Sequence, residues 1–192
     1  MPTQQKVRFR KLMILPCLIS VCLFILSGCS SPPKKIDPSK SGPQVIVNPE
    51  TIRLGVAKLM GTKIVFEGSG FKPGDSMFIT LIGPNQTKAI VAEAPIKPDG
   101  TFRAEVGDSS AAKLTKAMEI LKADIAMNEK FEPVIVISQP PIPEGAYTVK
   151  VTSMLSDLTA ETKLSLKGPS VIDKVKDRIG KLTGKIKYKK DK

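Results

Sequence analysis

The cysteines, at positions 17, 22 and 29, carry the most reactive side chains of this chain, and all three lie near its start. The sequence contains no histidine. Without histidine, the chain cannot form a Ser-His-Asp or Cys-His nucleophile system, a His-ligated zinc site or a haem held by His. What a cysteine can do here therefore depends on the segment that carries it.

Residues 1–28 have the three parts of an export signal. A basic start, Lys6–Lys11, precedes an uncharged apolar stretch, Leu12–Leu26, and small residues follow. The apolar stretch has 15 residues, and as a helix it would span roughly 22 Å, less than the ~30 Å hydrocarbon core, so we do not expect a permanent transmembrane helix. Removal of the signal would also remove the other two cysteines and leave Cys29 as a single thiol, which excludes a disulfide within the chain.

The quartet Leu26-Ser27-Gly28-Cys29 resembles the lipobox of bacterial lipoproteins. This resemblance implies cleavage between Gly28 and Cys29, transfer of a diacylglyceryl group to the Cys29 sulfur, and often acylation of the new amino group. Two or more acyl chains would attach the protein stably to a membrane. By the same analogy, Ser30 implies the periplasmic side of the outer membrane if the organism has one. The alternative is an ordinary signal peptide with a chance cysteine.

Residues 29–43 are expected to form a disordered tether behind the lipidated cysteine. From Ser30 to Pro43 the segment contains four prolines and four serines and almost no apolar residues, so it cannot bury enough surface to order itself. Fully extended, it would hold the following domain up to ~45 Å from the bilayer.

Residues 44–167 have the pattern of a β domain, in which short apolar runs alternate with turn signals. The runs are Gln44–Val47, Thr51–Leu54, Lys63–Phe66, Ser76–Ile82, Lys88–Ala94, Thr101–Val106, Pro133–Ile137, Ala146–Thr152 and Thr159–Leu166. This spacing predicts an antiparallel sandwich. Gly68–Asp75, Asp99–Phe102 and Pro143–Val149 resemble the turns and strand starts of immunoglobulin-like domains in bacterial surface proteins. The resemblance implies an immunoglobulin-like antiparallel β-sandwich and no particular activity.

A helix is predicted to interrupt the sandwich at about residues 109–129. Leu114, Met118, Leu121 and Ile125 are spaced so that they share one helical face. Such a helix can pack across an open end of the sandwich, or it can project and bind a partner through its apolar face.

Residues 168–192 predict a basic amphipathic helix. Ser170 occupies an N-cap position with Asp173 three residues later. The apolar stripe consists of Val171, Ile172, Val175, Ile179, Leu182 and Ile186. Gly180 and Gly184 are expected to weaken the helix by about 1 kcal/mol each, and the chain beyond Lys185 is too charged to order alone.

The net charge of +12 is concentrated at the two ends of the chain, with +4 near the start and +6 over residues 170–192. The domain between them is nearly neutral, so we expect no nucleic-acid partner. Basic amphipathic helices can lie on anionic membranes. The residues predicted to contact an anionic lipid or glycan are Lys181, Lys185, Lys187, Lys189 and Lys190. A solubilising tail, or a helix packed on the domain, is the alternative.

No group of residues in the sequence points to an enzyme, a metal site or a cofactor. Asp75 and Asp99 lie in turns that account for them, and no Asp-rich loop offers a Ca²⁺ site. We expect a non-catalytic, lipid-anchored envelope protein that binds another envelope protein or serves as an accessory subunit. The second hypothesis is a structural or surface-interaction protein whose basic tail contacts an anionic envelope polymer or lipid.

Overall fold

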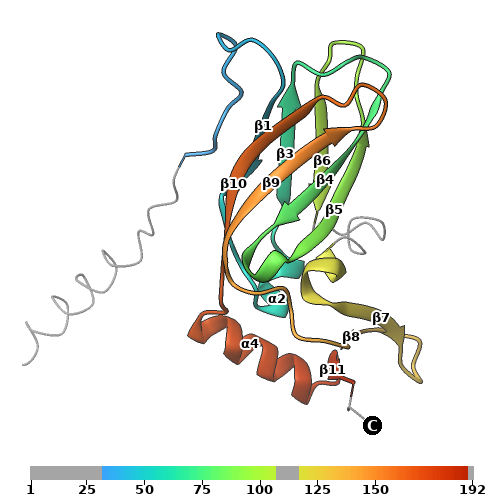
Figure 1. Ribbon diagram of the computed structural model, residues 1–192. Helices are drawn as coiled ribbons and strands as arrows, with labels where there is room; N and C mark the ends of the chain where they lie inside the picture. Colours follow the sequence, from blue (N-terminus) through green and yellow to red (C-terminus); the bar gives the residue numbers. More distant parts are fainter. Residues whose placement is uncertain (1–31, 107–116, 190–192) are drawn as a thin grey trace, which may run out of the picture. The chain divides into compact units, whose positions relative to one another are not determined.

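The computed structural model describes residues 32–106 and 117–189 of the chain. The elements below belong to one compact unit, residues 33–192, and it is mainly β, with three sheets and few helices (Figure 1). Among the described residues, no helix has both the length and the apolar character needed to cross a membrane.

Two of the sheets enclose the main core. The first has the order β1-β3-β6, all antiparallel, and the second has the order β2-β10-β9-β4-β5, in which β2 runs parallel to β10 and the other pairs are antiparallel. The strands of the first sheet are β1 (Gln44–Asn48), β3 (Ile64–Ser69) and β6 (Phe102–Val106). Those of the second are β2 (Thr51–Arg53), β4 (Ser76–Ile82), β5 (Lys88–Pro95), β9 (Gly145–Ser153) and β10 (Thr159–Lys167).

The core follows the two-residue period of these strands. Phe66 of β3, Ile79 of β4 and Val149 of β9 are fully buried, while their neighbours along each strand are at least partly exposed. Alternate side chains of a strand point to opposite faces, so each sheet gives one face to a common apolar cluster. The strands lie close to the predicted apolar runs because this alternation is a local property of the sequence.

The third sheet, of order β11-β8-β7, was not predicted as a unit. Its strands are β7 (Ala123–Met127), β8 (Pro133–Ile137) and β11 (Ile186–Tyr188). β7 pairs antiparallel with β8, and β11 pairs parallel with β8. The sheet therefore joins the chain end to the hairpin formed by β7 and β8.

The helix predicted over residues 109–129 is wrong beyond residue 121. Residues 117–121 are helical, and the first part of the predicted helix lies outside the described residues. Lys122 then takes the left-handed conformation (φ 50°), and the chain continues as β7. Pairing with β8 overrides the helical spacing, so Ile125 lies 40% exposed on a strand while Leu121 is buried.

Three further short elements complete the described chain. Helix α2 (Val56–Met60) follows β2, a 3-10 turn (Pro84–Gln86) follows β4, and helix α4 (Val171–Leu182) follows β10. Helix α4 packs against α2 at one end of the domain (Figure 1).

The segment before β1 makes hydrogen bonds to the domain. The Lys34 backbone N–H donates to the Asn48 side chain at 2.8 Å, and the Asn48 amide donates back to the Lys34 carbonyl at 3.0 Å. The Gln44 amide donates to the carbonyls of Asp37 and Lys40. Within the described residues, polar contacts with the domain therefore start at Lys34, ahead of the predicted boundary at Gln44.

Candidate functional site

Helix α4 has a well-formed start and end. The Ser170 backbone N–H and hydroxyl both donate to the Asp173 carboxylate, at 2.9 and 2.6 Å, and the Asp173 backbone N–H donates to the Ser170 hydroxyl at 3.2 Å. This capping box confirms the predicted N-cap. At the other end Gly184 is left-handed (φ 72°), and the Gly184 and Lys185 N–H groups donate back to carbonyls of the last turn. Gly184 thus terminates the helix rather than weakening its interior.

The helix is fixed to the domain by its acidic residues. The Asp177 carboxylate accepts hydrogen bonds from the N–H groups of Val56 and Ala57, at 3.0 and 2.9 Å, and so caps the N-terminus of α2. Asp173 is buried beside Gly55, where an added Cβ would lie 2.7 Å from the Asp173 Cβ. Hydrogen bonds from Ser170, then the positive charges of Arg53 and Lys58, lower the pKa of Asp173. The acidic face of α4 therefore points inward.

The apolar stripe of α4 faces away from the domain. Its five members are Val171 (79% exposed), Ile172 (67%), Val175 (54%), Ile179 (54%) and Leu182 (81%). The sixth residue predicted for this stripe, Ile186, is instead buried on β11 and lies against Gly180, where an added Cβ would meet it at 2.6 Å. An amphipathic helix usually buries its apolar stripe, and α4 does the opposite.

Sequence reasoning missed the residues that orient this helix, Gly55 and Asp177. A signal was present, because Asp173, Asp177 and Gly180 are spaced at i, i+4 and i+7 and so share the face opposite the stripe. A polar or small face of this kind can dock on the N-terminus of another helix.

Four of the five lysines predicted to contact an anion lie in the part of the chain that the structure describes. Lys181 lies over the Tyr188 ring, 3.9 Å from its centroid. Lys185 lines a hollow described below, while Lys187 and Lys189 lie exposed on β11 and directly after it. Lys190 lies outside the described residues, as do Gly28 and Cys29 of the predicted cleavage and lipidation site. Pairing of Ile186–Tyr188 with β8 orders a segment that its charge alone would not order.

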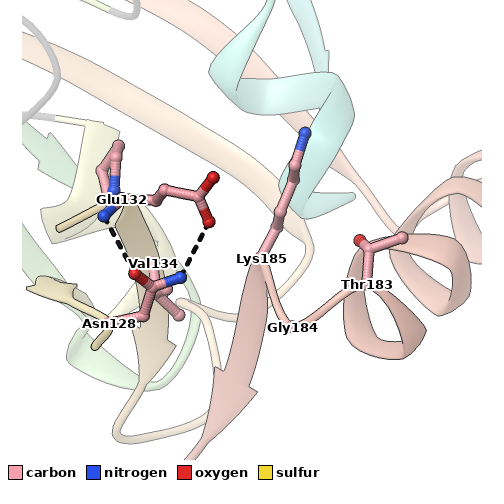
Figure 2. Close-up of a pocket in the computed structure, with 7 residues that line it drawn as sticks. Asn128, Glu132, Val134, Thr183, Gly184 and Lys185 are labelled. Atoms are coloured by element: carbon pink, nitrogen blue, oxygen red, sulfur yellow. Dashed lines mark hydrogen bonds between the residues drawn. The ribbon is translucent and has the colours of Figure 1, made fainter. Parts of the chain in front are cut away.

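A hollow of about 350 Å³ separates the β7–β8 hairpin from the turn after α4 (Figure 2). It is lined by Asn128, Glu132, Pro133, Val134, Thr183, Gly184 and Lys185. The Asn128 side chain makes its hydrogen bonds within the hairpin. It donates to the Glu132 carboxylate and accepts from the Lys130 and Glu132 N–H groups, all at 2.9 Å. The described residues contain no buried side-chain nitrogen or oxygen atom without a partner, so this hollow has no orphaned group that points to a ligand.

Asp75 and Asp99 hold turns together. The buried Asp75 carboxylate accepts hydrogen bonds from the hydroxyls of Ser153 and Ser156, at 2.5 and 2.9 Å, and from backbone N–H groups of the same loop. These bonds, led by that from Ser153, hold the pKa of Asp75 well below its usual range. Asp99 accepts from the Thr101 hydroxyl and N–H, which lowers the pKa of Asp99. Within the described residues, no group of three or more His, Cys, Asp or Glu side chains could hold a metal ion.

The comparisons with known proteins show only weak structural similarity. No protein-family model matches the chain, and no curated protein matches its sequence. Among solved structures, macromomycin is similar with a TM-score of 0.37 and 12% identity, over 66% of this chain and 100% of macromomycin. A likeness of this size assigns neither a fold family nor a function, so the site must be interpreted from its own residues.

Proposed function

We propose that this chain is a lipid-anchored protein of the bacterial cell envelope, and that its domain is a non-catalytic interaction module. The anchor is proposed from the lipobox-like quartet that ends at Cys29 and from the basic and apolar segments before it. The observation that carries the interaction role is the outward apolar stripe of α4, five aliphatic side chains that are each more than half exposed. Exposed apolar patches of this kind mark interaction sites.

The domain is proposed to be an immunoglobulin-like sandwich. Two observations support this assignment. If β1, β3 and β6 are strands A, B and E, and β4, β9 and β10 are C, F and G, then the orders β1-β3-β6 and β10-β9-β4 match those of the two immunoglobulin sheets. In addition, the Tyr147 hydroxyl near the start of β9 donates to the Pro143 carbonyl at 2.7 Å, as in the tyrosine corner of that fold.

Two measurements on the membrane-extracted full chain test this proposal. Intact mass spectrometry should find a mature chain that begins at Cys29 and carries acyl groups, and a non-acylated chain would refute the anchor. A photo-crosslinking residue at Ile179 in the stripe should capture an envelope component in cells. The same residue at Glu161, exposed on β10, is the control. Equal labelling at both positions would contradict the stripe as the interaction surface.

The second candidate function is contact with an anionic envelope polymer through the basic tail alone. Exposed Lys187 on β11 and Lys189 directly after it support this candidate, since both face solvent. Exchange of both lysines for glutamate would then release the protein from the polymer. If retention is unchanged while stripe substitutions abolish binding, the polymer hypothesis is refuted.

A further inference from the structure

We infer that the outward face of α4 lies in the interface of an anionic lipid bilayer, the same membrane to which Cys29 attaches the chain. This inference rests on the proposed function, and it names the partner of the stripe. It follows from three properties of the described residues: the position of the stripe on the helix, the charges beside it, and the place where the chain enters the domain.

The stripe has the width of an interfacial helix. At about 100° per residue, its five aliphatic positions fall within an arc of roughly 100° along the whole helix. A helix that lies in the plane of a bilayer interface buries such an apolar face at the boundary between headgroups and acyl chains. Three turns of exposed aliphatic side chains provide that face without any rearrangement of the domain.

The acidic residues of α4 face the domain and its basic residues face solvent, an arrangement that favours contact with an anionic surface. Both carboxylates of the helix point inward. Asp173 accepts a hydrogen bond from the Ser170 hydroxyl, and Asp177 accepts hydrogen bonds from the N–H groups at the start of α2. The exposed cations of α4 are Lys174, Lys176, Arg178 and Lys181. Helical spacing places Lys176 on one side of the stripe and Arg178 on the other, where their long side chains can reach phosphate groups while the stripe inserts. Each basic residue near an anionic surface strengthens binding roughly five-fold.

The entry point of the chain limits how far this helix can lie from the anchored residue. Among the described residues, Lys34 is the first that hydrogen-bonds to the domain, and its side chain pairs with Glu50 directly before β2. The five residue steps from Cys29 to Lys34 can span at most about 18 Å. The five steps from Glu50 to Gly55 have the same upper limit of about 18 Å. Gly55 begins α2, on which α4 is docked. A lipid at Cys29 would therefore keep α4 within reach of the bilayer that holds the anchor, which favours a membrane as the partner.

The test uses the cysteine content of the chain. After signal removal and acylation of Cys29, a cysteine introduced at Ile179 is the only free thiol of the full-length protein. This variant, Ile179→Cys, is labelled with an environment-sensitive fluorophore and reconstituted into phosphatidylcholine vesicles with or without phosphatidylglycerol. Brominated acyl chains in the vesicles quench a fluorophore that inserts among them. Glu161→Cys, which labels the exposed β10 surface, is the matched control, and circular dichroism checks that both variants are folded.

The expected result is a blue-shifted and strongly quenched label at position 179 in vesicles with phosphatidylglycerol, and an unshifted label at position 161. Replacement of Val175 by Asp in the Ile179→Cys chain should abolish the shift. Labels that behave alike at both positions in phosphatidylglycerol vesicles would overturn the inference, even if a crosslinker at Ile179 captures a protein in cells. Failure of the proposed anchor has a separate signature, because a non-acylated Cys29 would take up a second fluorophore and appear in the intact mass.

Discussion

Replacement of Asp177 by alanine tests whether polar contacts hold α4 with its apolar stripe outward. The substitution removes the carboxylate that accepts from the Val56 and Ala57 N–H groups. Gly55, the N-cap residue of α2, makes no side-chain capping bond of its own, so the start of α2 would lose its side-chain acceptor.

The expected loss in unfolding free energy is modest. Loss of an N-cap acceptor costs about 1 kcal/mol, with a range of roughly 0.5–2. Hydrogen bonds to a charged group fall in a similar or higher range, roughly 1.5–3 kcal/mol, but the Ala57 N–H is exposed and can bond to water instead. Alanine is also a better helix former than aspartate by about 0.7 kcal/mol, which offsets part of the loss within α4. The net destabilisation should be about 1 kcal/mol.

The assay combines urea unfolding, followed by circular dichroism, with amide hydrogen exchange of the folded protein. Exchange should accelerate at Val56 and Ala57 and throughout α4, because undocking of the helix exposes both. Lys174→Ala, on an exposed position of the same helix, should change the unfolding free energy by less than about 0.5 kcal/mol. If Asp177→Ala leaves exchange at Val56 and Ala57 unchanged, the capping contact does not hold the helix and the reasoning is refuted.

Three other substitutions probe the described contacts. Gly55→Ala should destabilise the protein by roughly 1–3 kcal/mol, because its Cβ would lie 2.7 Å from the Asp173 Cβ; Gly61→Ala, whose Cβ would meet nothing closer than 3.6 Å, is the control in the same urea titration. Tyr147→Phe removes a 2.7 Å hydrogen bond and should cost about 1 kcal/mol in thermal unfolding. The pKa of Asp75 is lower in the folded than in the unfolded chain, so its contribution to stability is complete above about pH 4 and falls as the pH decreases further. Asp75→Asn should therefore weaken the acid dependence of the urea midpoint, and an unchanged dependence would contradict that role.

Local features of this protein could be predicted from its sequence. Alternation of apolar residues along Thr159–Leu166 predicts a strand because a strand exposes and buries successive side chains whatever its partner is. The capping box of Ser170 and Asp173 needs only residues three apart, so it too could be read from the sequence.

Features that depend on pairing with another strand could not be predicted in this way. Ala123–Met127 fits a helical face by spacing, and only pairing with β8 makes it a strand. In the same way, Ile186–Tyr188 becomes a strand only through β8. From the sequence, Gly184 was expected to weaken a longer helix. In the structure it ends the helix in a left-handed conformation, and the chain after it pairs with β8.

The orientation of the apolar stripe of α4 was also set by tertiary contacts. The sequence determined that α4 has one apolar and one acidic face, because helical periodicity follows from residue spacing alone. It did not determine which face would be buried. That was decided by Gly55 and the free N–H groups of α2, more than a hundred residues earlier in the chain, which offer Asp177 hydrogen bonds and so turn the apolar stripe outward.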